Sequence, residues 1–183
     1  MRSVCGLLVA TTLVIGGCNR AEAPAEAPAT PAAPAAKAYA PLARMMQGIA
    51  FPASNIIFDT QTTDPGKTKE ASDPSGGATQ QFSGVYGGWM AVENAALALQ
   101  ETANLLMIPG RNCENGKPVP IHEATYRKAA EGLAEAGRAA YTAAQTKNLD
   151  AMVEVSGTVS DACAMCHEKY RDTPKQPTDR CMP

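Results

Sequence analysis

The chain is poor in aromatic residues, which make up 5% of its 183 residues, and it carries a formal net charge of only −2. Few aromatic residues and abundant alanine favour a helical protein over a β-sandwich. No segment shows the alternation that predicts a strand. Because no basic stripe stands out, nucleic acid is not an expected partner. The length is sufficient for one domain with its own core.

The first residues indicate an export signal rather than part of the fold. The apolar run at residues 7–15 is too short to span a bilayer as a helix. It ends in Ile-Gly-Gly-Cys at residues 15–18, which resembles the lipobox of bacterial lipoproteins. That resemblance implies a signal peptide over residues 1–17 and lipidation of Cys18, with a plain secretory signal as the alternative. We therefore expect a periplasmic protein with a lipid anchor in the inner or the outer membrane.

An alanine- and proline-rich stretch follows the candidate lipidation site. It has almost no bulky side chains to bury, and its prolines favour extended conformations. We expect residues 18–38 to form a semi-rigid tether and residues 39–183 to form one folded domain.

Three long stretches repeat apolar or small residues at helical spacing. They begin near Trp89, Glu123 and Leu149, and Pro109-Gly110 ends the first of them. Their stripes consist of Trp89, Val92, Ala96, Leu99, Ala103 and Leu106; of Tyr126, Ala130, Leu133, Gly137, Ala140 and Ala144; and of Met152, Ser156, Val159, Cys163, Cys166 and Tyr170.

A fourth helix is predicted from Leu42, with Pro52 interrupting it and Ser54 capping a second piece. The polar residues 61–82 predict a long loop or lid. Three long helices and one interrupted helix predict an all-α protein, an antiparallel four-helix bundle with long loops between helices.

One of only two histidines directly follows a cysteine pair, in Cys163-Ala164-Met165-Cys166-His167. This is the C-x-x-C-H pattern of covalent haem attachment. On a helix, the spacing places both thiols and the imidazole on nearly one face. The thiols can then add to the porphyrin vinyl groups while the imidazole reaches the iron. We predict one haem c, attached through Cys163 and Cys166, with His167 as an axial ligand of the iron.

Three other interpretations of these residues are weaker. A redox-active cysteine pair needs a βαβ context, which the pattern lacks. A zinc site needs further ligands, for which Cys113, His122 and Cys181 are candidates without paired spacing. Two structural cysteines would leave His167 unexplained.

The attachment motif lies in the last helix of a bundle, and the ending CAMCHEKYR at residues 163–171 resembles that of the cytochrome c′ class. The similarity covers roughly residues 39–171 and includes MMQGIAFPASNIIFD and YGGWMAVENAALALQETANLLMIPGR, which look like a bacterial branch of this class. It implies a bundle with haem near the end of the C-terminal helix. It also implies that Arg171 lies on the proximal side near His167, although a solvated helix end explains Arg171 equally well. Pro52 and the long loops depart from the simplest members.

The class covers the distal face of its haem with the first helix, and some members supply a methionine ligand there. The resemblance favours Met46 in this role, with Met45 as the alternative. Adjacent residues on a helix lie about 100° apart, so only one of them can face the iron. In the other interpretation both methionines fill the core. His122 is better explained as a surface loop residue than as a distal ligand.

Other residues allow two interpretations. Trp89, Tyr126 and Tyr141 could pack against the porphyrin or within the protein core. Arg127 and Arg138 fit solvated helix faces better than contacts with haem propionates.

Two cysteines remain once Cys18 carries lipid and the C-x-x-C-H pair carries haem. They are Cys113 and Cys181, in an oxidising compartment. We predict a disulfide between them that pins residues 172–183 to the loop after the first long helix, the one that begins near Trp89. Two free or intermolecular thiols are the alternative.

These features predict electron transfer by a monohaem cytochrome, with a redox protein of the periplasm as its partner. A five-coordinate haem protein that binds NO or CO is the second hypothesis. A haem peroxidase is the third, and His122 would be its only candidate distal acid or base. We do not expect an enzyme, and the pattern leaves homodimer formation open.

Overall fold

A computed structural model of the chain describes residues 36–67, 77, 86–173 and 176–181. They belong to a compact unit that extends over Ala35–Pro183. The predicted signal peptide, Cys18 and nearly all of the predicted tether lie outside the described residues. The same holds for most of the predicted lid at residues 61–82.

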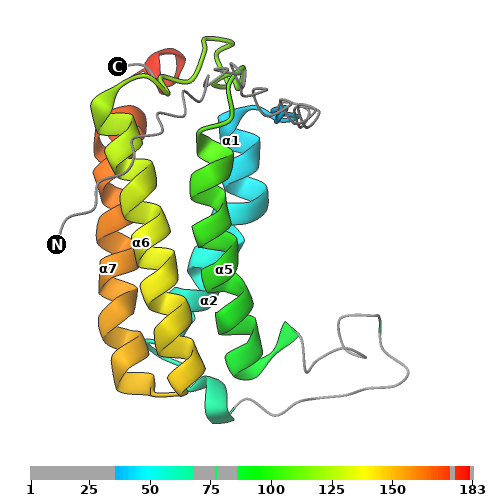
Figure 1. Cartoon of the computed structure of the whole chain (residues 1–183), viewed down its shortest axis with the longest axis vertical. Coiled ribbons are helices and arrows are strands. Elements are labelled where there is room, and N and C mark those ends of the chain that lie inside the picture. The colour runs from blue at the N-terminus through cyan, green and yellow to red at the C-terminus, as the bar shows by residue number, and fades with distance from the viewer. Residues whose placement is uncertain (1–35, 68–76, 78–85, 174–175, 182–183) are drawn as a thin grey trace, which may run out of the picture. The chain divides into compact units, whose positions relative to one another are not determined.

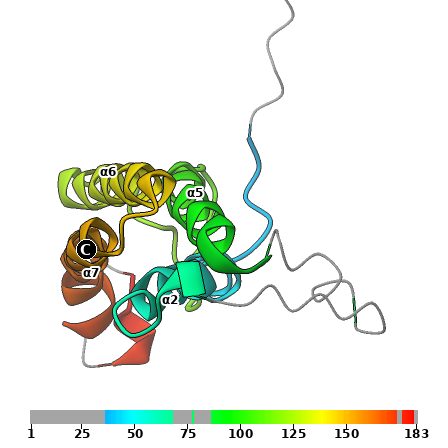
Figure 2. The same cartoon turned by 90° about the horizontal axis from the view of Figure 1, so that it is seen from below.

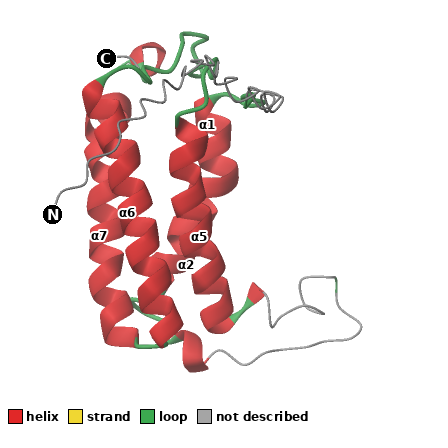
Figure 3. Ribbon diagram, viewed as in Figure 1, coloured by secondary structure: helices red, strands yellow, loops and turns green. Residues whose placement is uncertain are grey.

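Four helical runs form a bundle (Figure 1). The first consists of α1 (Leu42–Met45), a π-helical turn η1 (Met46–Ala50) and α2 (Phe51–Asp59); the others are α5 (Gly88–Leu106), α6 (Ala124–Thr146) and α7 (Leu149–His167), which continues into a second π-helical turn, η3 (Glu168–Asp172). Short 3₁₀ turns lie at η2 (Pro65–Lys67) and η4 (Pro177–Asp179). The described residues contain no strand, and only Asn112 and Pro118 form an isolated bridge (Figure 3). The predicted helical class is confirmed.

The bundle packs α5 against α6, α6 against α7, and α2 against both α5 and α7 (Figure 2). The predicted stripes supply most of the core. Its fully buried side chains include Ile57 of α2, Leu99 of α5, Tyr126 of α6 and Met152 and Val159 of α7. Because small residues dominate the stripe of α6, its neighbours can approach closely.

The prediction that Pro52 interrupts the first helix is wrong. The backbone stays helical through Ala50 and Phe51, and Pro52 lies in the first turn of α2. Proline is tolerated there because an amide at the start of a helix needs no intrahelical acceptor. The π-helical turn before it changes the hydrogen-bond register at the point where an α-helix would be broken. Ser54 is not a cap, since its Oγ donates to the Phe51 carbonyl within the same helix at 3.0 Å.

The connection between α6 and α7 has clear local causes. Lys147 ends α6 in the left-handed conformation, with φ of 53°. Asn148 then caps α7, because its Oδ1 accepts a hydrogen bond from the Ala151 amide at 3.1 Å. The cap satisfies one of the free amides at the start of the helix. It thereby sets the start of the helix that carries the C-x-x-C-H motif.

A buried arginine holds the segment that follows α5. Arg111 is 5% exposed, and its guanidinium donates to the Leu105 carbonyl at 3.1 Å and to the Ala40 carbonyl at 2.6 Å. The first contact satisfies a carbonyl at the end of α5, and the second ties this end to the chain just before α1. The Leu42 amide also donates to the Asn112 carbonyl at 2.8 Å. These bonds position the loop that contains Cys113 beside the start of the first helical run.

Gly137 of α6 lies close to the backbone of α5. A Cβ built there would lie 2.7 Å from the Gln100 amide nitrogen and 3.1 Å from the Ala96 carbonyl oxygen, both of which are backbone atoms of α5. We expect Gly137→Ala to lower the free energy of unfolding by about 1–3 kcal/mol, because the helices must separate. Gly157→Ala in α7 is the matched control, since nothing lies within 4 Å of its Cβ position. This control should stabilise by up to about 1 kcal/mol through helix propensity. Urea unfolding measures both, and equal stability of the two variants would contradict the close approach.

Candidate functional site

A largely apolar cavity of about 630 Å³ lies between the first helical run and the facing parts of α6 and α7. This volume is within the range of small-molecule and cofactor sites, about 300–1,000 Å³. Its apolar walls include Leu42, Ala50 and Phe51 from the first run, Ala129, Ala130 and Leu133 from α6, and Ala162 from α7. The cavity therefore suits a mainly apolar occupant.

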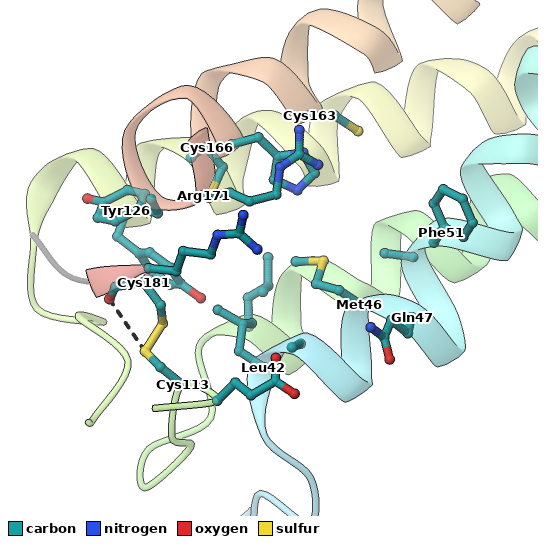
Figure 4. A pocket seen from close by; sticks show the side chains of 18 of the residues that line it. Leu42, Met46, Gln47, Phe51, Cys113, Tyr126, Cys163, Cys166, Arg171 and Cys181 are labelled. Carbon is teal, nitrogen blue, oxygen red and sulfur yellow. Dashed lines mark hydrogen bonds between the residues drawn. A yellow bond between two sulfur atoms is a disulfide. The ribbon is translucent and has the colours of Figure 1, made fainter. Parts of the chain in front are cut away.

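All three residues of the C-x-x-C-H motif line this cavity. Cys163, Cys166 and His167 lie at positions i, i+3 and i+4 of α7, and each is half-buried. The two cysteines are free thiols in this structure. Figure 4 shows them on the α7 side of the cavity, opposite the first helical run. The structure therefore brings these three predicted site residues together.

Burial keeps these groups uncharged. It raises the pKa of Cys163 and raises that of Cys166 to about 11, although the nearby Arg171 opposes both shifts. Burial also lowers the pKa of His167, and repulsion from Arg171 lowers it further. At neutral pH the side chains are therefore two thiols and a neutral imidazole. A neutral imidazole is the form that binds a metal.

The opposite wall distinguishes the two candidate methionines. Met46 is half-buried and lines the cavity from the first turn of η1 (Figure 4). Met45 is 5% exposed, belongs to the hydrophobic core and does not line the cavity. The structure thus places Met46 across the cavity from the motif and assigns Met45 to core packing.

Both π-helical turns border the cavity. One begins at Met46, and the other starts directly after His167 and carries Tyr170 and Arg171. Such turns are rare and occur frequently at functional sites. They shift the side chains that follow relative to a regular α-helix, so the sequence periodicity alone does not place these residues.

Arg171 lines the cavity but already has a partner. Its Nε and Nη2 donate to the two carboxylate oxygens of Asp172 at 2.6 and 2.9 Å. This hydrogen bond is the main reason that the pKa of Asp172 is lowered. Both groups are exposed, so the pair is screened by solvent.

Tyr126 lies at the cavity wall and carries a buried hydroxyl. The residue is 1% exposed, its ring packs edge to face on Tyr170 at 5.4 Å, and its hydroxyl has no hydrogen-bond partner among the described residues. Burial raises its pKa far above the ordinary value. Leaving such a hydroxyl unpaired costs about 1–3 kcal/mol.

A polar network fixes the end of the motif helix against the start of α6. The Tyr170 hydroxyl lies 2.7 Å from the Glu123 carboxylate and 2.6 Å from the Thr125 hydroxyl. Lys169 donates to the same two groups at 3.2 and 2.9 Å. The hydrogen bond from Tyr170 is the main cause of the lowered pKa of Glu123. The network holds the segment after His167 in place.

Several sequence-predicted candidates lie elsewhere. Trp89, Tyr141 and Arg138 are not part of the cavity wall. His122 is exposed in the turn before α6, and its carbonyl accepts a hydrogen bond from Arg127. The zinc alternative loses two candidate ligands, because Cys113 and Cys181 are joined to each other. Across the described ranges, no cluster of three or more histidine, cysteine or acidic residues could hold a metal ion.

The disulfide between Cys113 and Cys181 joins the loop after α5 to the C-terminal segment, with Cα atoms 5.8 Å apart. Both cysteines also line the cavity (Figure 4). Their sequence neighbours Glu114 and Arg180 line it too. Sequence reasoning missed Glu114 and Arg180 as cavity residues. Neither belongs to an apolar stripe or to a motif that carries the resemblance, so no signal in the pattern marks them.

We expect the double substitution Cys113→Ser/Cys181→Ser to lower the free energy of unfolding by about 4 kcal/mol. The reason is that the bridge closes a loop with a sequence separation of 68 residues and restricts the unfolded chain. Thiol titration of denatured, unreduced wild-type protein with haem attached should find no free thiol from this pair. Two free thiols per chain would show that the bridge does not form in solution.

Comparison of the chain with models of protein families, with curated proteins and with solved structures found no match. In the part of the chain that the structure describes, no helix is both long enough and apolar enough to cross a bilayer.

Proposed function

We propose that this protein is a periplasmic c-type cytochrome that resembles the cytochrome c′ class and transfers electrons through one covalently attached haem. The proposal includes an antiparallel four-helix bundle with the haem near the end of its C-terminal helix. It also includes a lipid anchor at Cys18 and a periplasmic redox protein as partner.

One observation carries the proposal. Cys163, Cys166 and His167 line a single apolar cavity of about 630 Å³, and Met46 lines the same cavity from the opposite helix. A haem c site with His/Met ligation needs two thiols for covalent attachment, and a neutral imidazole and a thioether as ligands of the iron. All four groups line this apolar cavity. The residues present therefore fit haem.

The roles of the side chains follow from their chemistry. The thiols of Cys163 and Cys166 would hold the haem covalently, which would prevent its loss by dissociation. His167 would supply an imidazole nitrogen to the iron, and Met46 would supply a thioether sulfur. Haem provides one-electron redox chemistry, whose potential is tuned by axial ligands and burial. The apolar walls limit access of water to it.

Visible spectra of protein produced in a periplasm with haem-attachment machinery test the proposal. We expect a c-type spectrum that persists after denaturation. A low-spin iron that binds CO poorly favours electron transfer. If the iron is high-spin and binds CO readily, gas binding becomes the better explanation of the function than electron transfer. Colourless protein would overturn the proposal altogether.

Lipid anchoring is tested separately. We expect mass spectrometry of the mature protein to find an acylated N-terminal Cys18, and Cys18→Ala to move the protein from the membrane fraction to the soluble periplasmic fraction. Two or more acyl chains anchor stably, whereas one alone does not. Cys5→Ala is the matched control, because Cys5 lies in the predicted signal peptide and should change nothing. An unmodified N-terminus on soluble wild-type protein would contradict the anchor.

A further inference from the structure

The C-terminal segment 176–181, here called the strap, forms one wall of the cavity. Pro177, Thr178, Arg180 and Cys181 all contribute to that wall. The strap lies beyond residue 171, where the resemblance to the cytochrome c′ class ends. Its position therefore has to be explained from the contacts of this chain.

Three kinds of contact hold the strap. The disulfide joins its last described residue, Cys181, to Cys113. The Asn115 side-chain amide donates to the carbonyls of Thr178 and Arg180. The Cys181 amide donates to the Tyr170 carbonyl, which lies at the end of the motif helix. The strap is thus attached both to the loop after α5 and to the segment that follows His167.

The strap brings a positive charge to a cavity that is otherwise mainly apolar. The charged side chains of the cavity wall are Arg171, Arg180 and Glu114. Arg171 is engaged by both carboxylate oxygens of Asp172. Arg180 forms no ion pair with any residue that the structure describes. It acts on Asp172 only as a weak, more distant charge.

We propose that Arg180, held at the cavity by the Cys113–Cys181 disulfide, pairs with a propionate carboxylate of the haem. This inference rests on the proposed function. The propionates are the anionic groups of haem, and an apolar cavity cannot accept a carboxylate without a partner. Arginine suits this role because its planar guanidinium matches a carboxylate in a bidentate manner. The disulfide gives the pairing its geometry, since an exposed arginine near a chain end would otherwise sample many conformations.

The test compares midpoint reduction potentials of the haem-loaded protein. Oxidised haem carries one more positive charge than reduced haem, so removal of a nearby positive charge favours the oxidised state. Arg180→Met should lower the midpoint reduction potential. At a fixed solution potential, the ratio of oxidised to reduced protein should rise by about two- to fifteen-fold. This range corresponds to charges roughly 10 Å apart at an effective dielectric constant between about 80 and about 20.

Three variants make this shift specific. Arg180→Lys keeps the charge and should retain most of the wild-type potential. Arg138→Met removes one positive charge from an exposed position of α6 outside the cavity and should leave the potential nearly unchanged. In a Cys113→Ser/Cys181→Ser background, Arg180→Met should have a much smaller effect, because the strap no longer holds the guanidinium in place. In that background the amide of residue 181, which donates to the Tyr170 carbonyl in the wild type, should exchange its hydrogen faster.

The outcomes separate this inference from the proposed function. Wild-type protein without covalent haem would defeat the proposed function. If the wild type carries haem but the Arg180→Met and Arg138→Met variants have the same midpoint reduction potential, only the pairing of Arg180 with a propionate is refuted. An equal effect of Arg180→Met with and without the disulfide would defeat the role of the strap. If the disulfide variant does not fold, the comparison of Arg180→Met, Arg180→Lys and Arg138→Met still decides the pairing, because both positions are exposed.

Discussion

Replacement of both Cys163 and Cys166 by serine should abolish the haem that remains with the denatured protein. The wild type should keep all of its haem through denaturation, because thioether bonds survive loss of the fold. A single substitution should weaken or abolish retention, since one bond at most can form. The measurement is haem absorbance that co-migrates with the chain under denaturing conditions.

The other cysteine pair provides a control with the same number of sulfur atoms removed. Cys113→Ser/Cys181→Ser should lower stability and keep covalent haem, because these residues are joined to each other on a different wall of the cavity. Haem that is fully extracted from the wild type by acidic acetone would refute covalent attachment. Retention in the Cys163→Ser/Cys166→Ser variant would refute the assigned attachment sites.

Met46→Ala should open the site to carbon monoxide. If the Met46 sulfur occupies the axial position opposite His167, its removal converts low-spin iron to high-spin iron and frees a coordination site. We expect the affinity for CO to rise by at least about tenfold, because CO no longer has to displace the Met46 sulfur from the iron. A tenfold change in affinity corresponds to about 1.4 kcal/mol of binding free energy. A weak charge-transfer band at the red end of the oxidised spectrum, implied for methionine ligation by the family resemblance, should disappear.

Met45→Ala is the matched control, since it removes the same side chain one residue earlier. Met45 is buried in the core, so this variant should lower the free energy of unfolding by about 2–5 kcal/mol and leave the spectrum unchanged. Met46 is only half-buried, and its removal should affect stability less. If the wild type is already high-spin and binds CO readily, the methionine has no ligand role and gas binding replaces electron transfer as the proposed function.

The local pattern was sufficient for the three long helices. Apolar and small residues recur with helical spacing in α5, α6 and α7, and Pro109-Gly110 marks the end of α5. The first helical run was predicted less well. Proline was expected to break it, whereas a π-helical turn accommodates Pro52 within one continuous run. A change of hydrogen-bond register of this kind leaves no clear mark in the spacing of apolar residues.

The sequence by itself determined the helical class, where α5, α6 and α7 begin and the grouping of Cys163, Cys166 and His167 on one helix face. These features depend on residues three or four positions apart, and helix geometry relates such residues without reference to the rest of the chain. Only the tertiary structure decided that Met46 rather than Met45 lines the cavity and that the buried Tyr126 hydroxyl has no partner among the described residues.

Only the tertiary structure, too, placed Arg180 at the cavity wall. The cysteine count predicted a bridge from Cys113 to Cys181, but it did not indicate that the bridged segment would border the cavity. The physical reason is that this arrangement depends on contacts between distant segments, such as those of Arg111 with Ala40 and of Asn115 with the strap. Hydrogen bonds of this kind can form in many registers of an unfolded chain, and packing of the whole bundle selects among them.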